Sequence, residues 1–409
     1  MNPMFSRLCC VLVAGVLFNA AHAQPPSPLA PGVAPSLKSA VEAAWMRAVE
    51  ATDAEGQLAR AHAGRAAATT LWAAPPALEL SHRDDRLTGN AGQRESEIGV
   101  AWPLLLPGQR AARTSTADAE LTVAEAYQRA AKLRLAGEVR EAAWTVSARR
   151  AELRLLQTQL STLDALAGDV DRRVAAGDLA RADALAARAE VLAARALSSE
   201  AQQGVQAAES RWRVLTGVEP LQVPVEPAPH SPVANHPELV LAGLEVERAR
   251  ARAALLRVSR SDPPELRVGV REDVPGRGLG AQSSIGVAVR VPFGTRDRNL
   301  PREAAASSAV DLALAQERRL RDRLQAEAAV TRAGVEAAAL QLAAEESRVG
   351  ALRERSKLLD TSFRAGETSL PELLRAMGTT TQAEVGAARA GLAVGLARSR
   401  LQQTLGIIP

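Results

Sequence analysis

The chain has 409 residues, of which 47% are hydrophobic and only 2% aromatic, and its formal net charge is +4. This composition favours long helices and coiled coils over a compact core built on aromatic side chains. Basic and acidic residues interleave, and no Lys/Arg cluster is combined with aromatic residues, so nucleic-acid binding is not supported. No catalytic Ser/His/Asp set or nucleotide-binding loop is present, and the histidines lack ligand spacing. We therefore expect no enzyme activity, no cofactor and no metal site.

The first 23 residues are predicted to be a secretory signal peptide. Arg7 precedes the apolar run Leu8–Phe18, and Ala21-His22-Ala23 offers a cleavage site. Cys9 and Cys10 both lie in this segment, so we expect no disulfide in the mature protein, and Arg7 stands too close to them for a lipoprotein site. No later apolar run reaches the length of a membrane-spanning helix, whereas a β-barrel is not excluded.

The remainder of the chain is predicted to be two copies of one unit. Three pairs of segments match at nearly one offset: Pro75–Leu80 with Pro263–Val268, Val174–Asp178 with Phe363–Glu367, and Thr216–Val218 with Leu405–Ile407. We place the first repeat at residues 24–217, a proline-rich linker at 218–235 and the second repeat at 236–409. Each repeat is predicted to run helix, strand, strand, long helix, helix.

The long helix of each repeat carries a seven-residue apolar period, which is typical of a left-handed coiled coil. The first such helix, Gln109–Ala176, would be roughly 100 Å long at 1.5 Å per residue, which favours a rod or tube. Arg149, Glu345 and Ser356 interrupt the period. The main seam positions are Val139, Val146, Leu153, Leu160, Ala167 and Val174, then Val335, Leu342, Val349, Ser356 and Phe363.

The predicted strands alternate between apolar and polar or small residues. Leu78 and Leu80 alternate with Glu79, and Val268 and Val270 alternate with charged or small neighbours. This pattern suits a barrel wall with lipid outside and water inside, although a soluble sheet half-buried on the helices would give the same alternation. The connecting segments 85–96 and 272–283 are predicted to be exposed loops.

Several of these segments resemble one known family. Phe363–Ala376 resembles its pattern of an aromatic residue, Gly, Ser/Thr and an acidic residue before Leu, and Val174–Ala186 is a weaker copy. Ile98–Pro103, Val287–Pro292 and the terminal Leu405-Gly406 also fit. The sequence thus resembles the outer-membrane efflux proteins typified by TolC, among them the CzcC-like metal-efflux and RND-pump outer components.

The resemblance implies a mainly α fold with a small β part. Three subunits would each give four strands to a twelve-stranded transmembrane β-barrel, and the coiled-coil helices would form an α-helical barrel. It implies an outer-membrane protein that extends into the periplasm. Its partners would be a periplasmic adaptor (membrane fusion) protein, an inner-membrane RND-type pump and outer-membrane lipid. The cargo would be metal cations or small toxic compounds. A periplasmic coiled-coil adaptor or scaffold protein is the alternative function.

The resemblance also implies roles for particular residues. Periplasmic tip and adaptor contacts would come from Gly177, Leu179, Leu185, Gly366, Leu370 and Leu374, with the leucines exposed. Alternatively, the glycines only turn the chain and the leucines pack in the core. The pore constriction would involve Asp183, Glu372 and Arg375, and the two acids could instead be ordinary first-turn helix residues. Glu79, Arg267, Arg271 and Arg290 would line the barrel lumen. Trp72, Trp102 and Phe293 are the candidates for a membrane-interface girdle.

Overall fold

A computed structural model describes residues 36–409 except 88, 223, 225, 227–234, 294 and 295. The predicted signal peptide and much of the predicted linker lie outside the described residues.

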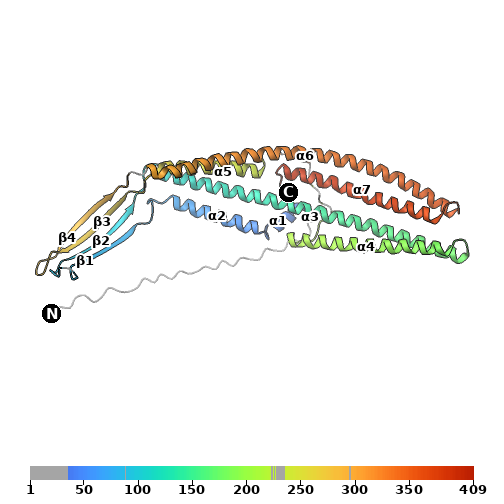
Figure 1. The fold of residues 1–409 in the computed structure, drawn as a ribbon, viewed down its shortest axis with the longest axis horizontal. Coiled ribbons are helices and arrows are strands. Elements are labelled where there is room, and N and C mark those ends of the chain that lie inside the picture. Colours follow the sequence, from blue (N-terminus) through green and yellow to red (C-terminus); the bar gives the residue numbers. More distant parts are fainter. Residues whose placement is uncertain (1–35, 88, 223, 225, 227–234, 294–295) are drawn as a thin grey trace. The chain divides into compact units, whose positions relative to one another are not determined.

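Each half of the chain contains one or two helices, then two strands, a long helix and a return helix (Figure 1). The first half contains α1 (Leu37–Trp45), α2 (Val49–Ala68), β1 (Ala77–Asp84), β2 (Arg94–Pro103), α3 (Gln109–Ala176) and α4 (Arg181–Thr216). The second contains α5 (Pro237–Val258), β3 (Glu265–Val274), β4 (Gln282–Arg290), α6 (Arg296–Arg364) and α7 (Leu370–Thr404). The first predicted helix is divided into α1 and α2, because α1 turns its apolar face, including Trp45, into the core.

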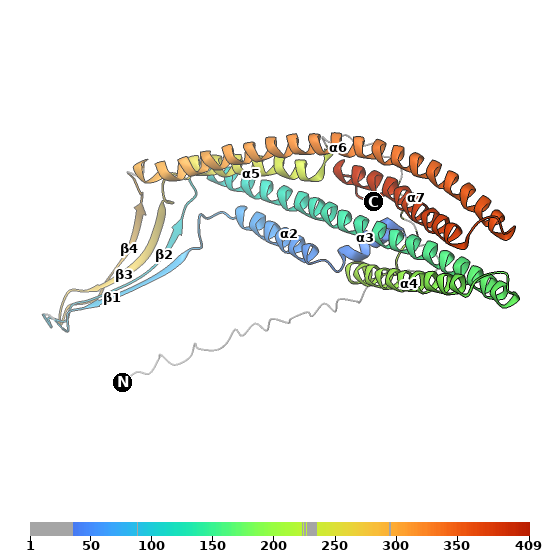
Figure 2. The same cartoon turned by 45° about the vertical axis from the view of Figure 1, so that its right-hand side comes forward.

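Helix α3 is the central helix of the described residues. It packs against α2 and α5 in its first half and against α4 and α7 in its second half, while α6 packs on α5 and α7. The order across the bundle is therefore α2, α3, α5, α6 near the sheet and α4, α3, α7, α6 towards the helical tip (Figures 1 and 2). Consequently α6 forms one edge of the bundle, and α2 and α4 form the other.

The predicted coiled-coil seam of α3 is confirmed by burial. Val139, Val146 and Ala167 are buried. Two of the three polar interruptions, Arg149 on α3 and Glu345 on α6, lie opposite glycines of α4 and α7. A Cβ atom on Gly204 would lie 3.6 Å from Arg149 Cδ, and one on Gly386 would lie 3.4 Å from Glu345 Oε2. The bare glycine surface makes room for each charged side chain without separating the helices.

The four strands form one antiparallel sheet in the order β1-β2-β3-β4. Leu78, Val100, Val268 and Val287 lie side by side in the register, and so do Glu79, Gly99, Gly269 and Gly286. Neighbours in a register share a face, so all four strands contribute to one apolar face and one polar face. The loops are shorter than predicted, at residues 85–93 and 275–281, because polar pairs such as His82 with Ser96 extend the ladder.

Candidate functional sites at the helical tip and on the sheet

Both hairpin turns at the tip depend on glycine. Gly177 has a φ of 87° and Gly366 a φ of 81°, in the left-handed region that ends helices. In the first turn the Asp178 amide donates to the Arg173 carbonyl at 2.9 Å, and in the second the Glu367 amide donates to the Ser362 carbonyl at 2.9 Å. The prediction that these glycines turn the chain is therefore confirmed.

An apolar cluster lies directly behind the turns and joins the two hairpins. Leu163 and Val170 of α3 pack with Phe363 of α6 and with Leu370 and Leu373 of α7. The prediction of an exposed Leu370 is wrong, because the first turn of α7 inserts it into this cluster, where it is 2% exposed.

The other predicted tip leucines differ from Leu370 in exposure. Leu179 and Leu374 are partly buried against the same cluster. Leu185 is 59% exposed, so it remains available to a partner.

The predicted constriction residues lie at the starts of the two return helices. Asp183 accepts a hydrogen bond from the Ala180 amide at 3.2 Å and so caps α4. Glu372 occupies the first turn of α7, and both it and Arg375 are exposed. Within the described part of this single chain, Glu372 and Arg375 form no ion pair with each other.

A contact that the sequence reasoning missed connects the two hairpins. The Arg173 guanidinium lies 5.0 Å from the centre of the Phe363 ring and donates to the Phe363 carbonyl at 3.3 Å. A cation over a ring is worth about 0.5–1 kcal/mol at exposed sites. Phe363 is an aromatic residue in a chain with only 2% aromatics, and that rarity was the signal that could have identified it.

A groove of about 860 Å³ follows the tip between α3 and α6, with α7 as its floor. Its rim is charged, and its floor carries Leu373, Met377 and Thr380. The charged residues are Asp169, Arg172, Arg173, Asp178, Arg353, Lys357, Asp360 and Arg364. Apolar floor and charged rim are the features that a docked helix would match.

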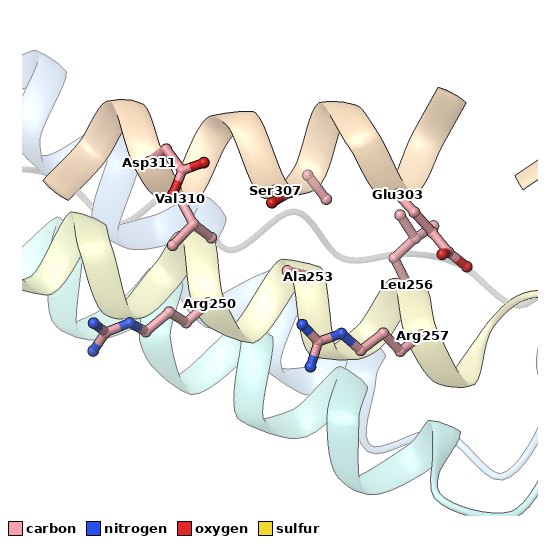
Figure 3. A pocket seen from close by; sticks show the side chains of 9 residues that line it. Arg250, Ala253, Leu256, Arg257, Glu303, Ser307, Val310 and Asp311 are labelled. Carbon is pink, nitrogen blue, oxygen red and sulfur yellow. The ribbon is translucent and has the colours of Figure 1, made fainter. Parts of the chain in front are cut away.

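A second crevice, of about 460 Å³, lies between α5 and α6 (Figure 3). Arg250 and Arg257 project from α5, and Glu303, Ser307 and Asp311 come from α6, above small residues such as Ala253. It includes none of the predicted site residues.

The two faces of the sheet differ in chemistry, as predicted. On the apolar face Leu80, Ile285 and Val287 are strongly exposed, and Phe293 beyond β4 is 92% exposed. On the other face, the four predicted lumen residues occur together and form ion pairs. Arg267 pairs with Glu79 at 2.9 Å, Arg271 with Glu95 at 2.5 Å, and Arg290 with Glu265 at 3.8 Å.

Comparison with known proteins shows what this chain is similar to. Residues 45–218 match the model of the family described as outer membrane efflux protein. The chain as a whole has the fold of solved outer-membrane channels. Three solved structures share this fold over nearly the whole of this chain. No curated protein sequence matches it.

The three structures are similar to this chain in fold at low sequence identity. The CusC structure, from a study of its folding and transmembrane channel formation, has a TM-score of 0.77 at 16% identity and covers 91% of this chain and 92% of its own. The outer membrane protein VceC of Vibrio cholerae has a TM-score of 0.73 at 16% identity, covering 90% and 96%. The open-state outer membrane channel MtrE of Neisseria gonorrhoeae has a TM-score of 0.73 at 18% identity, covering 91% and 89%.

Among the described residues, no helix is both long enough and apolar enough to cross a membrane.

Proposed function

We propose that this TolC-like protein is the outer-membrane exit duct of a tripartite efflux system and works as a ring of three identical subunits. The proposal rests on one observation: the sheet and the helix bundle each have two open edges, and these edges lie on the same two sides of the chain. β1 and β4 are the edge strands, and they connect directly to the edge helices α2 and α6. Because an open strand edge is not tolerated in lipid, β4 of one copy would pair with β1 of the next.

The helix edges support the same closure. Besides the seam that faces α7, α6 exposes a second stripe at heptad spacing, in which Val330 is 71% and Leu340 is 74% exposed. The exposed members are Ala326, Val330, Ala333, Ala337, Leu340, Ala344, Ser347, Ala351 and Leu358. Such a stripe is the requirement for packing a further helix. On the opposite edge, α4 exposes Leu185, Ala189, Leu192 and Ala196 at the same spacing.

This arrangement gives a head-to-tail contact that closes into a ring rather than a two-fold dimer. Four strands from each of three copies make an even-numbered barrel of a size known in outer membranes. Its apolar face would contact lipid, with Trp72, Trp102 and Phe293 at one membrane interface. The helices would continue the duct into the periplasm.

The helical tip supplies the regions for partner contact and gating. The α3–α6 groove would receive the helical hairpin of a periplasmic adaptor, which links the duct to an inner-membrane RND-type pump. Three copies of Glu372 and Arg375 would surround the closed end, where an ion pair between neighbouring subunits biases the tip towards closure. Cargo would be metal cations or small toxic compounds moved by the pump.

Inter-subunit cross-linking tests the ring. Counted from the tip, Leu185 of α4 and Leu358 of α6 lie at similar heights, so Leu185→Cys with Leu358→Cys should give disulfide-linked trimers on mild oxidation in outer-membrane fractions. The matched control joins Leu185→Cys to Val349→Cys, since Val349 is buried on the α7 side of α6. Recovery of the protein as a soluble periplasmic monomer without cross-links would reject the duct and favour a scaffold protein.

A further inference from the structure

The polar face of the sheet contains a band without side chains. Gly99, Gly269 and Gly286 stand next to one another in the register, and Glu79 is the remaining member of that row. A Cβ atom on Gly269 would lie 2.9 Å from the Ile98 carbonyl oxygen, so the backbones of β2 and β3 approach too closely for a larger residue there. In this row of the polar face, therefore, only Glu79 projects a side chain.

Arg267 uses this bare strip to cross a strand. It belongs to β3, yet its Nε, shielded from solvent, lies 2.9 Å from a carboxylate oxygen of Glu79 on β1, on the far side of β2. A Cβ atom on Gly99 would lie 3.5 Å from the same Nε, so the side chain passes over Gly99. The Nε–H is not aimed at Glu79, which makes this contact an ion pair rather than a hydrogen bond.

A second carboxylate holds the other end of the guanidinium. Arg267 Nη2 lies 3.0 Å from Glu97 Oε1 on β2. The guanidinium is thereby kept along the wall between two carboxylates, and it does not project from the sheet.

The neighbouring charges complete a neutral set. Arg271 and Arg83 both pair with Glu95, at 2.5 Å and 3.8 Å. Three guanidinium groups on β1 and β3 (Arg83, Arg267, Arg271) are thus matched by three carboxylates on β1 and β2 (Glu79, Glu95, Glu97). Asp273, the register neighbour of Glu95 four residues beyond Gly269, adds one negative charge outside this set. Because each cation lies beside a carboxylate, the fields of the pairs cancel over a short distance.

We propose that Arg267 determines the charge selectivity of the duct at this level. Glu79 and Glu97 hold its side chain flat over Gly99, so that the wall is wide here and carries no net charge. The proposal rests on the proposed function, in which this face lines the lumen. An exit with such a wall passes solutes without regard to the sign of their charge, and it leaves the choice of cargo to the pump and the tip.

Charge-neutralising variants of the full-length protein test this role in planar bilayers. The measurement is the reversal potential under a KCl gradient at about 0.1 M salt, where the Debye length is about 10 Å. Glu79→Gln leaves one excess positive charge per copy, and we expect the cation-to-anion permeability ratio to fall by about threefold. Arg267→Gln leaves one excess negative charge, and the ratio should rise by about the same factor. The double variant restores neutrality and should return the ratio to the wild-type value.

Two glycine variants separate the geometry from the charge. Gly99→Val fills the strip beneath Arg267 and should push the guanidinium into the lumen, which lowers conductance and shifts selectivity towards anions. Gly286→Ala is the matched control in the same row, since a Cβ atom there would have no neighbour within 4 Å, and it should change neither quantity.

The possible results separate the role of Arg267 from the proposed function. If the wild type forms channels and both single charge variants have the wild-type reversal potential, the role of Arg267 is overturned and the duct remains. A double variant that does not recover the wild-type ratio would overturn the pairing. Absence of any channel from the wild type would overturn the proposed function and this inference with it. The charge variants alone decide the question if Gly99→Val fails to assemble.

Discussion

A buried ion pair at the middle of the bundle should dominate the stability of the junction between the two halves. Arg140 of α3 has a side chain that is 2% exposed, and its partner Glu226, from the predicted linker, is 7% exposed. Arg140 Nη2 lies 2.7 Å from Glu226 Oε2, and Ser399 of α7 donates to the same carboxylate. Arg140 also donates to Gln403 Oε1 at 2.6 Å and to the Ile407 carbonyl at 3.0 Å.

Removing one member of this pair should be costly. Glu226→Ala leaves the guanidinium buried without its countercharge, a change that costs about 3–5 kcal/mol. The free energy of the local unfolding that exposes the last turn of α7 should fall by that amount. Since about 1.4 kcal/mol is a factor of ten, amide exchange there should accelerate by roughly a hundredfold to a few thousandfold.

A neighbouring ion pair, between α3 and α7, provides the matched control. Glu141 pairs with Arg400 at 2.6 Å, but their side chains are 48% and 57% exposed. Solvent-exposed pairs contribute about 0–1 kcal/mol, so Glu141→Ala should accelerate exchange by less than about tenfold. The double variant Arg140→Met with Glu226→Leu should recover much of the loss, because it removes both buried charges.

Hydrogen exchange of purified protein, read by mass spectrometry over residues 395–407, makes the comparison. Equal effects of Glu226→Ala and Glu141→Ala would refute the argument from burial. So would a double variant that is as unstable as Glu226→Ala.

Three further predictions concern other parts of the molecule. Burial lowers the pKa of His236, whose neutral Nδ1 accepts the Glu238 amide at 3.2 Å and caps α5. The stability that this cap contributes is therefore present above the unfolded pKa of about 6.5 and is lost as the pH falls through the lower folded pKa. Melting temperatures measured from about pH 8 to about pH 5 should show this loss, and His236→Asn should make the melting temperature depend less on pH. Arg173→Ala should loosen the tip and raise single-channel conductance, whereas unchanged conductance would remove this contact from the gate. Val268→Arg should reduce trimer yield in outer-membrane fractions far more than Arg271→Gln, because a charge at the lipid midplane costs about 2–4 kcal/mol; equal yields would contradict the assigned faces.

The sequence by itself determined the elements with strong periodicity. The bounds of the first long helix, Gln109–Ala176, were readable because glycines stand at both of its ends and its seven-residue period is long. The alternation of Leu78, Glu79 and Leu80 likewise placed their side chains on opposite faces, since the side-chain period of a strand is two.

Only the tertiary structure decided which of these residues meet. Leu370 and Leu185 look alike in the sequence, yet one is enclosed by both hairpins and the other faces outwards, because burial depends on where a second hairpin packs. Arg173 and Phe363, or Arg140 and Glu226, are far apart in the chain and belong to no shared period. Arg267 was predicted to face the lumen, but its crossing of β2 required the register that brings Gly99 beneath it. Periodicity is a local property of the backbone, whereas contacts between hairpins and between strands depend on their relative register, which no single segment encodes.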